Sequence, residues 1–413
     1  MSYLEFAKRL RATNILSDPW VEGEPRFREE AVVLADFDRR ALFRAAEDIG
    51  ALYNEVCRIC FQEPRLLDEF FGMTPFQKLM WLSSAPAWHG IARADVFCTD
   101  DGLKVCELNC DTPSGEAEAV LLGPIAREAR PDLVDPNEGL FAHFCRMIAA
   151  VAGPRARQDL SIGIVYPTEM TDDLSMVELY RRGFEREGWR VTLGSPFNLS
   201  ESRDGRATLF GRECDVLVRH YKTDWWGERE PIWDDAELVA DSEPLAEALG
   251  VALRSHLSGR SVVINPFGAV LPQNKRAMAL MWEEKQRFPA WAQQTIEHLV
   301  PPTRRLETTS LVEMKNDKDA WVLKSDYGCE GTEIVMGVDC DDEAWRLALE
   351  HARPGRWIAQ RRFVPRIEAS NGESVNYGVY LVAGEACGVL SRLQVGATDR
   401  FARMAPTLAE KPS

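Results

Sequence analysis

The stretch from Arg93 to Glu116, RADVFCTDDGLKVCELNCDTPSGE, constrains the fold more than any other part of the chain. Two runs of alternating residues flank a short polar turn, in which Gly102 suits the left-handed position of a hairpin loop. The pattern therefore predicts a β-hairpin. If Thr99 lies opposite Leu103, the expected cross-strand pairs are Arg93–Asn109, Asp95–Glu107 and Phe97–Val105.

The two faces of this hairpin differ in chemistry, because successive side chains of a strand point to opposite sides. One face can pack on a core and departs from apolar character only at Lys104; its other members are Ala94, Val96, Cys98, Cys106 and Leu108. The second face is polar and carries Arg93, Asp95, Glu107 and Asn109.

Opposed carboxylates on one strand face weaken a hairpin through repulsion. A hard divalent cation removes that cost, since carboxylate and amide oxygens are the ligands that Mg²⁺ prefers. Arg93 beside them suits a phosphate or carboxylate bound by a planar fork. The polar face therefore predicts a metal and anion site. A solvent-facing polar strand is the alternative for an arbitrary hairpin.

The segment after the hairpin strengthens the site interpretation. Thr112 or Asp111 is expected to N-cap a helix from Ser114 to about Arg130, with Pro113 in its first turn. The amide-rich start of that helix would point toward the carboxylates, where anions bind readily.

At these residues the chain resembles the synthetase part of glutathionylspermidine synthetase and its shorter, synthetase-only relatives, a circularly permuted branch of the ATP-grasp ligases. The family carries Arg-x-Asp, eleven residues and then Glu-x-Asn, and the spacing here is the same. The resemblance implies that Asp95, Glu107 and Asn109 hold Mg²⁺. It further implies that Arg93 is catalytic, contacting the reacting acid and phosphate, and that Thr112 and Ser114 contact substrate.

Composition limits the partners and the compartment. The chain has 413 residues, enough for two or three domains, and a net charge of −16, which argues against nucleic acid or an anionic membrane as a partner. We expect a cytoplasmic protein, because the sequence has neither a membrane-spanning apolar run nor a signal peptide at its start. The ten cysteines are expected to be reduced, with Cys57 and Cys60 as buried thiols rather than zinc or redox groups.

The pattern along the chain divides it into three expected regions. Residues 1–152 combine a helical segment, including an amphipathic helix from Phe37 to Phe61, with the hairpin. Residues 153–258 alternate strands and helices and predict a small parallel α/β domain. Its expected elements are strands Ser161–Tyr166, Trp189–Leu193, Ala207–Phe210 and Cys214–His220, helix Leu174–Glu187 and one or two helices in Asp235–His256. Residues 259–413 form the nucleotide-binding region.

Three residues of the middle region leave alternatives open. Trp225 and Trp226 either line a substrate cleft or pack as ordinary aromatic residues. His220, which follows a buried strand, is more often a satisfied core histidine than a base.

The third region contains a second candidate motif. A strand from Trp321 carries Lys324 inward, a loop holds Gly328 and Gly331, and a strand returns at Glu333 to Met336. Such a loop lets backbone amides approach phosphates, which the lysine neutralises. Upstream, Gln273-Asn-Lys275 is expected to open a helix through Trp282, where a lysine suits a shared phosphate site.

The resemblance gives further residues a role. It implies ATP contacts for Lys275 and Lys324, and an adenine-facing hinge strand over 357–365 that includes Gln360. It also implies a phosphate contact for Arg392, in a hairpin of Ser374–Ala383 and Glu385–Val395, and a closing segment at Thr398–Arg403. A solvated lysine and a surface salt-bridge arginine are the alternatives for Lys275 and Arg392.

Together these motifs predict an α+β protein with a circularly permuted ATP-grasp fold and an additional small parallel-sheet α/β domain. The implied activity is ATP- and Mg²⁺-dependent ligation of a small-molecule or peptide carboxylic acid to an amine, through an acyl phosphate and with release of ADP. The acid and the amine stay open, glutathione and spermidine included. A non-catalytic ATP-binding sensor and a phosphotransferase are the alternative functions.

Overall fold

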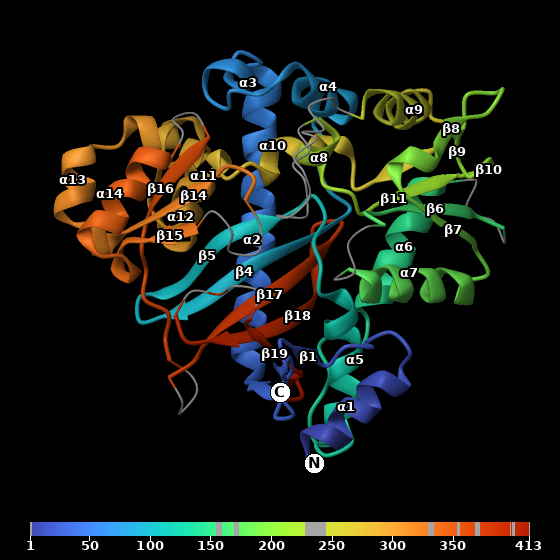
Figure 1. The fold of residues 1–413 in the computed structure, drawn as a ribbon, viewed down its shortest axis with the longest axis horizontal. Coiled ribbons are helices and arrows are strands. Elements are labelled where there is room, and N and C mark those ends of the chain that lie inside the picture. The colour runs from blue at the N-terminus through green and yellow to red at the C-terminus, as the bar shows by residue number, and fades with distance from the viewer. Residues whose placement is uncertain are drawn as a thin grey trace.

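The computed structural model describes residues 2–153, 159–168, 173–227, 245–328, 334–352, 356–367, 372–396, 398 and 401–412. A central antiparallel sheet lies between two other bodies (Figure 1). One is a parallel sheet with helices, drawn in green and yellow; the other is an antiparallel sheet with helices, drawn in orange. Mixed helices and strands agree with the predicted fold class.

The central sheet joins two hairpins that are far apart in the sequence. Its strand order is β19-β18-β17-β4-β5, all antiparallel. The first hairpin is β4 (Ile91–Thr99) with β5 (Gly102–Asn109), and the second is β17 (Ser374–Val382) with β18 (Glu385–Gln394). Both hairpins were predicted. Strand β19 (Arg403–Ala405) completes the sheet, whose apolar face packs on the long helix α2 (Asp36–Gln62).

The register of the first hairpin confirms the prediction at one end and corrects it at the other. Asp95 lies opposite Glu107 and Arg93 opposite Asn109, as expected. Beyond Asp95 the register shifts, so that Phe97 faces Lys104 and not Val105. Cys106 is the additional residue of this β-bulge, which turns a strand locally. Val105 consequently joins Val96 in the core, and the expected apolar-face position of Cys106 was wrong.

The parallel sheet confirms the small α/β layer. Its order is β12-β11-β6-β7, formed by β6 (Ser161–Val165), β7 (Arg190–Gly194), β11 (Val216–Arg219) and β12 (Val262–Ile264). Strand β12 pairs here although we expected its residues in the third region. The predicted strand near Ala207 lies elsewhere, in an antiparallel sheet of β8 (Leu199–Glu201), β9 (Ala207–Leu209) and β10 (Arg212–Glu213). Helices α6 (Leu140–Ala152), α7 (Leu174–Arg186), α8 (Thr223–Gly227) and α9 (Ala246–Leu257) accompany these strands.

The second antiparallel sheet has the order β13-β16-β14-β15. Its strands are β13 (Thr303–Arg305), β14 (Trp321–Ser325), β15 (Ile334–Met336) and β16 (Trp357–Arg361), and its helices are α11 (Arg276–Glu283), α12 (Ala290–Leu299), α13 (Leu311–Asn316) and α14 (Asp342–His351). The helix expected from Gln273 is interrupted, because Asn274 is extended after α10 (Val270–Gln273) and its side chain accepts the Arg276 N–H at 2.9 Å.

The helix after the first hairpin also starts later than expected. It is α5 (Glu116–Arg127), preceded by Gly115 in a left-handed conformation with φ 93°, so neither Thr112 nor Asp111 caps it. Asp111 is instead buried against the α/β layer. Its carboxylate accepts hydrogen bonds from Arg219 at 2.5 Å and from the Thr223 N–H and hydroxyl at 2.6 and 3.0 Å. An ion pair with this many donors satisfies the carboxylate better than a cap would.

Segments near both ends of the chain lie beside the central sheet. Strand β3 (Val32–Leu34) pairs in parallel with β20 (Thr407–Ala409), while α1 (Tyr3–Ala12), β1 (Trp20–Val21) and β2 (Glu24–Pro25) precede it. Short helices α3 (Leu66–Glu69) and α4 (Pro75–Ser84) follow α2. Within the described ranges, no helix has the length and apolar character needed to cross a lipid bilayer.

The two cysteines of helix α2 are free buried thiols, as predicted. Burial raises the pKa of Cys60 to about 12, so this thiol stays protonated.

Candidate active site

A pocket of about 780 Å³ lies where the central sheet meets the two flanking bodies, and we call it the central pocket. Most of the residues that the sequence singled out line it. They are Arg93, Asp95, Glu107, Asn109, Thr112, Ser114, Lys324, Gly328, Gln360, Arg392 and Thr398. Lys275 lies behind Glu107, while Gly331 is outside the described residues. The structure thus gathers side chains from the first hairpin, the second hairpin and strands β14 and β16.

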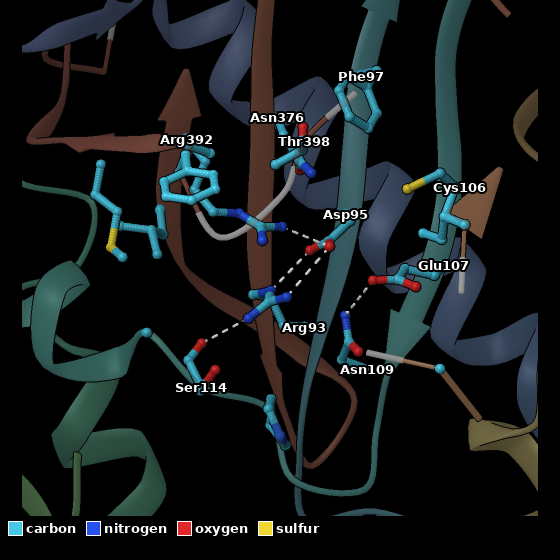
Figure 2. Close-up of a pocket in the computed structure, with 18 of the residues that line it drawn as sticks. Arg93, Asp95, Phe97, Cys106, Glu107, Asn109, Ser114, Asn376, Arg392 and Thr398 are labelled. Carbon is cyan, nitrogen blue, oxygen red and sulfur yellow. Dashed lines mark hydrogen bonds and ion pairs between the residues drawn. The ribbon is translucent and has the colours of Figure 1, made fainter. Parts of the chain in front are cut away.

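Asp95 is held between two arginines at the centre of this pocket (Figure 2). Arg93 donates to it through Nε at 2.8 Å and Nη2 at 3.3 Å, and Arg392 donates through Nη2 at 2.6 Å. Burial acts to raise the pKa of Asp95, but the charges of Arg392 and Arg93 outweigh it and hold the pKa well below its usual range. The carboxylate is therefore ionised, and two positive charges face it.

Arg93 also reaches the segment before helix α5. Its Nη1 donates to the Ser114 carbonyl at 2.8 Å, so the guanidinium spans the sheet and the start of α5. Gly378 on the neighbouring strand makes this possible, because a Cβ there would lie 2.7 Å from Arg93 Cδ. The planar fork is thus positioned by three bonds and the backbone beside it.

Glu107 is the more open of the two opposed carboxylates. It accepts a hydrogen bond from Asn109 Nδ2 at 3.1 Å, and Lys275 Nζ lies 3.7 Å from its other oxygen. Lys275 in turn donates to the Gly328 carbonyl at 2.5 Å. The lysine therefore connects the first hairpin to the start of the glycine loop.

The β-bulge brings Lys324 into the site. Lys324 Nζ donates to the Cys106 carbonyl at 3.3 Å, and Cys106 is the residue that the bulge leaves without a cross-strand partner. On strand β16, Gln360 lines the same wall and donates to Thr303 at 2.9 Å. The flanking antiparallel body thus presents a buried cation and an amide to the pocket.

The residues expected to hold Mg²⁺ fit such an ion by their chemistry. Within the residues placed by the structure, no three His, Cys, Asp or Glu side chains form a metal-binding group. All three line the pocket, but Asp95 is already paired with two arginines, whereas Glu107 and Asn109 make no hydrogen bond to an arginine. Magnesium in nucleotide sites commonly takes one or two carboxylates and completes its shell with phosphate and water, which this donor set allows.

The central pocket has a second wall, of which the sequence suggested only Trp225 as a possible cleft residue. It is formed by Arg26, Glu118, Asp173, His220 and Trp225. Trp225 lines the pocket, whereas Trp226 is a core residue packed on Tyr221 and Phe267, which resolves that alternative. The expectation of a core histidine was incomplete, since His220 is buried but also lines the pocket, with Nε2 at 2.9 Å from Asp173.

Two buried carboxyl groups lie at the start of α5, Glu118 in this wall and Glu116 behind it. Burial raises the pKa of Glu116 to about 7 and also raises that of Glu118. Tyr180 donates to Glu116 at 3.3 Å, and the second oxygen of Glu116 has no hydrogen-bond partner among the residues described. No local pattern in the sequence separates these two glutamates from ordinary acidic residues of a first helical turn.

Comparisons with known proteins agree with the architecture. Residues 21–410 match the family described as glutathionylspermidine synthase preATP-grasp. A glutathione synthetase-like effector from Globodera pallida, in apo form, aligns with 98% of this chain and 97% of its own at a TM-score of 0.58 and 11% identity. A putative γ-glutamylcysteine synthetase from Methylobacillus flagellatus aligns over 84% and 85% of the two chains, with 13% identity and a TM-score of 0.44. No protein of curated function matches the sequence significantly.

The family match covers most of the chain, and the similarity to the effector shows a shared fold. Both agree with the predicted ATP-grasp fold and its additional parallel α/β layer. The chain belongs to the glutathionylspermidine synthase preATP-grasp family, a family of synthetase type.

Proposed function

We propose that this protein is an ATP-dependent ligase that joins a carboxylic acid to an amine and releases ADP and phosphate. The observation that carries the proposal is the convergence of Arg93, Lys324 and Arg392 with opposed carboxylates in one pocket. Membership of a synthetase-type family supports it. In this reaction a carboxylate oxygen of the acid attacks the γ-phosphorus of ATP, and the amine then displaces phosphate from the resulting acyl phosphate.

The residues of the central pocket suit the first step. Carboxylate and triphosphate repel each other, so the reaction needs preorganised cations around the transferring phosphoryl group. We assign Arg93 to the acid carboxylate and the phosphoryl group, and Lys275, Lys324 and Arg392 to the phosphates. The amides near Gly328 and Gly331 would cover the phosphates, and Gln360 would contact adenine.

Asp95, Glu107 and Asn109 are the proposed Mg²⁺ residues, with Glu107 and Asn109 the more accessible of the three. Bound there, the ion would neutralise phosphate charge as a Lewis acid. Thr112 and Ser114, which line the pocket next to Arg93, are the proposed contacts for the acid substrate. We further propose the circularly permuted order of the fold and the three regions 1–152, 153–258 and 259–413, with Val262–Ile264 paired into the middle one.

Nucleotide binding is tested by thermal denaturation. MgATP at a large excess over its dissociation constant stabilises a protein that binds it by about 3 kcal/mol. Lys324→Ala should lose most of the resulting rise in melting temperature. Lys104→Ala is the matched control, since Lys104 Nζ donates to the His298 carbonyl outside the pocket. An unchanged shift in Lys324→Ala would remove this lysine from the nucleotide site.

Ligation is tested by ADP release with a panel of amino acids and short peptides as acids, and polyamines, amino acids or hydroxylamine as amines. We expect ADP release that requires both an acid and an amine, with an equal amount of amide or hydroxamate. ATP binding without any such turnover would favour a non-catalytic nucleotide-binding protein. A phosphorylated product formed without an amine would favour a phosphotransferase.

A further inference from the structure

His220 lies at the point of the parallel sheet where the strand order reverses. From β6 the chain continues to β7 on one side, whereas β11 pairs with β6 on the other side. Ligands of open parallel sheets bind outside the carboxyl ends of the strands where the order reverses in this way. His220 follows β11 directly, and its N–H donates to the Val165 carbonyl at the end of β6 at 2.7 Å. Its side chain lines the central pocket there.

Asp173 fixes the orientation of the imidazole. The distance between His220 Nε2 and Asp173 Oδ2 is 2.9 Å, and His220 is only 5% exposed. Burial acts to raise the pKa of Asp173, but the interaction with His220 lowers it, so the carboxylate stays ionised. With the Nε2 proton donated to Asp173, the lone pair lies on Nδ1, for which the described part of the chain offers no hydrogen-bond partner.

The surroundings of this pair favour a cation. Glu118 lines the pocket, is 4% exposed, and makes no side-chain hydrogen bond to another residue within the described ranges. The other charged or titratable groups with electrostatic contact to the pair or its neighbours are Glu116, Arg26, Arg93, Tyr180 and Tyr380. Asp173 is the carboxyl group of this set whose pKa is lowered, so a protonated amine beside His220 would face its negative charge.

A ligase of the proposed kind needs a proton acceptor next to its amine substrate. An aliphatic amine is protonated near neutral pH and has no lone pair with which to attack. We propose that His220, oriented by Asp173, is the general base that deprotonates the amine substrate; this proposal rests on the proposed ligase function.

Nδ1 of His220 takes one proton from R–NH₃⁺, and the imidazolium is stabilised by the Asp173 carboxylate. The free amine forms a C–N bond to the acyl carbon, and the C–O bond to phosphate breaks. Phosphate leaves with the electron pair of that bond, the second ammonium proton passes to the phosphate, and His220 returns its proton to solvent.

Hydroxylamine separates this role from a structural one, because it is unprotonated at neutral pH and needs no base. The experiment uses the acid that gives the most ADP release with wild-type protein, and compares a protonated alkylamine with hydroxylamine. His220→Gln keeps an N–H for Asp173 but lacks a base, so the pocket should stay intact. His143→Gln on helix α6, outside the lining of the pocket, is the matched control.

We expect His220→Gln to lose about 10²-fold in turnover with the alkylamine and to stay within a few-fold of wild type with hydroxylamine. In this variant the alkylamine rate should rise with pH in proportion to the free amine in solution, because only amine that is already deprotonated can attack, so its pH profile should be steeper than that of wild type. Asp173→Asn should show the same selective loss, to a smaller extent. His143→Gln should match wild type with both nucleophiles.

Equal loss with both nucleophiles, or no loss with the alkylamine, would overturn the assignment of His220. If His220→Gln no longer shows the melting-temperature shift with MgATP, Asp173→Asn decides by the same comparison. Wild-type protein that forms neither amide nor hydroxamate with any acid would instead contradict the ligase function itself.

Discussion

Asp95 in the central pocket and Glu116 behind its second wall are both 2% exposed, yet their carboxyl groups are in opposite electrostatic states. Two arginines lower the pKa of Asp95, whereas burial raises the pKa of Glu116 to about 7. Equal burial therefore does not decide the charge of a carboxyl group. The charge depends on whether a cation is hydrogen-bonded to the carboxylate, because its attraction offsets the desolvation of the anion.

This difference in carboxyl pKa distinguishes the wall formed by the first hairpin, which we call the hairpin wall, from the second wall, and the two suit different chemistry. On the hairpin wall, charges are fixed and paired, which suits the electrostatic stabilisation of phosphoryl transfer. On the second wall, Glu118 and the neighbouring Glu116 have raised pKa values and the His220 imidazole lines the pocket, which suits proton exchange. Four substitutions, taken in order of decreasing effect, test this contrast.

Asp95→Asn should be the most disruptive, since it leaves Arg93 and Arg392 buried without their counter-charge. We expect a decrease in the free energy of unfolding of about 3–5 kcal/mol, measured by chemical denaturation. The control is Asp132→Asn, which breaks the exposed pair with Arg130 and should change stability little. A loss no greater than in the control would show that the two arginines do not depend on Asp95.

Arg93→Lys should fold but react slowly. Lysine keeps the charge, yet one ammonium cannot reproduce the bonds to both Asp95 oxygens and to the Ser114 carbonyl. We expect turnover to fall by about 10²–10³-fold, as for loss of a transition-state donor, while ATP affinity by calorimetry changes little. Arg346→Lys, on the exposed face of α14, is the control. Near wild-type turnover would contradict the role of Arg93.

Glu116→Gln should change how stability depends on pH. A folded-state pKa of about 7 against an ordinary 4.5 means that the folded protein binds the proton more tightly than the unfolded chain. This stability is complete below pH 4.5 and is lost as the pH rises to 7, by roughly 3 kcal/mol at most. The variant should lack that loss when unfolding is measured at several pH values. Asp95, whose pKa is lowered, contributes stability that is lost only in acid.

Glu107→Gln should have the smallest effect on folding. The side chain is 26% exposed, its lysine lies 3.7 Å away, and the opposed Asp95 is already neutralised by arginines. We expect less than about 1 kcal/mol of change in unfolding free energy. Turnover should nevertheless require far more Mg²⁺ than in wild type. Severe unfolding would mean that Glu107 is a structural carboxylate.

Alternation along the two strands predicted which polar side chains share one face of the hairpin. The loop is one residue shorter than expected, with Thr99 opposite Gly102, and the bulge at Cys106 restores the expected pairing of Asp95 with Glu107. The bulge could not be predicted, since Val105 and Cys106 are both compatible with a core. Its position depends on packing against α2 and on Lys324, which belongs to a distant strand.

The residues of the second wall could be brought together only by knowing the folded structure. His220 and Asp173 meet only because β6 and β11 are neighbours in the parallel sheet, and no spacing in the sequence predicts that contact. Asp111 resembled a helix cap until its partners Arg219 and Thr223 were known. Trp225 and Trp226 are adjacent and similar, so that only the surrounding structure distinguishes a pocket residue from a core residue.

The contact between Arg26 and Met404 affects when the pocket is completed during synthesis of the chain. The Met404 N–H donates to the Arg26 carbonyl at 3.1 Å, the Arg28 N–H donates to the Met404 carbonyl at 2.8 Å, and both Arg26 and Met404 line the pocket. These partners come from opposite ends of the described chain. Contacts of such large sequence separation form late in folding, after the closure of a very long loop. During synthesis, therefore, the pocket stays incomplete until the segment around Met404 has left the ribosome, so a partly made chain lacks the complete set of pocket residues.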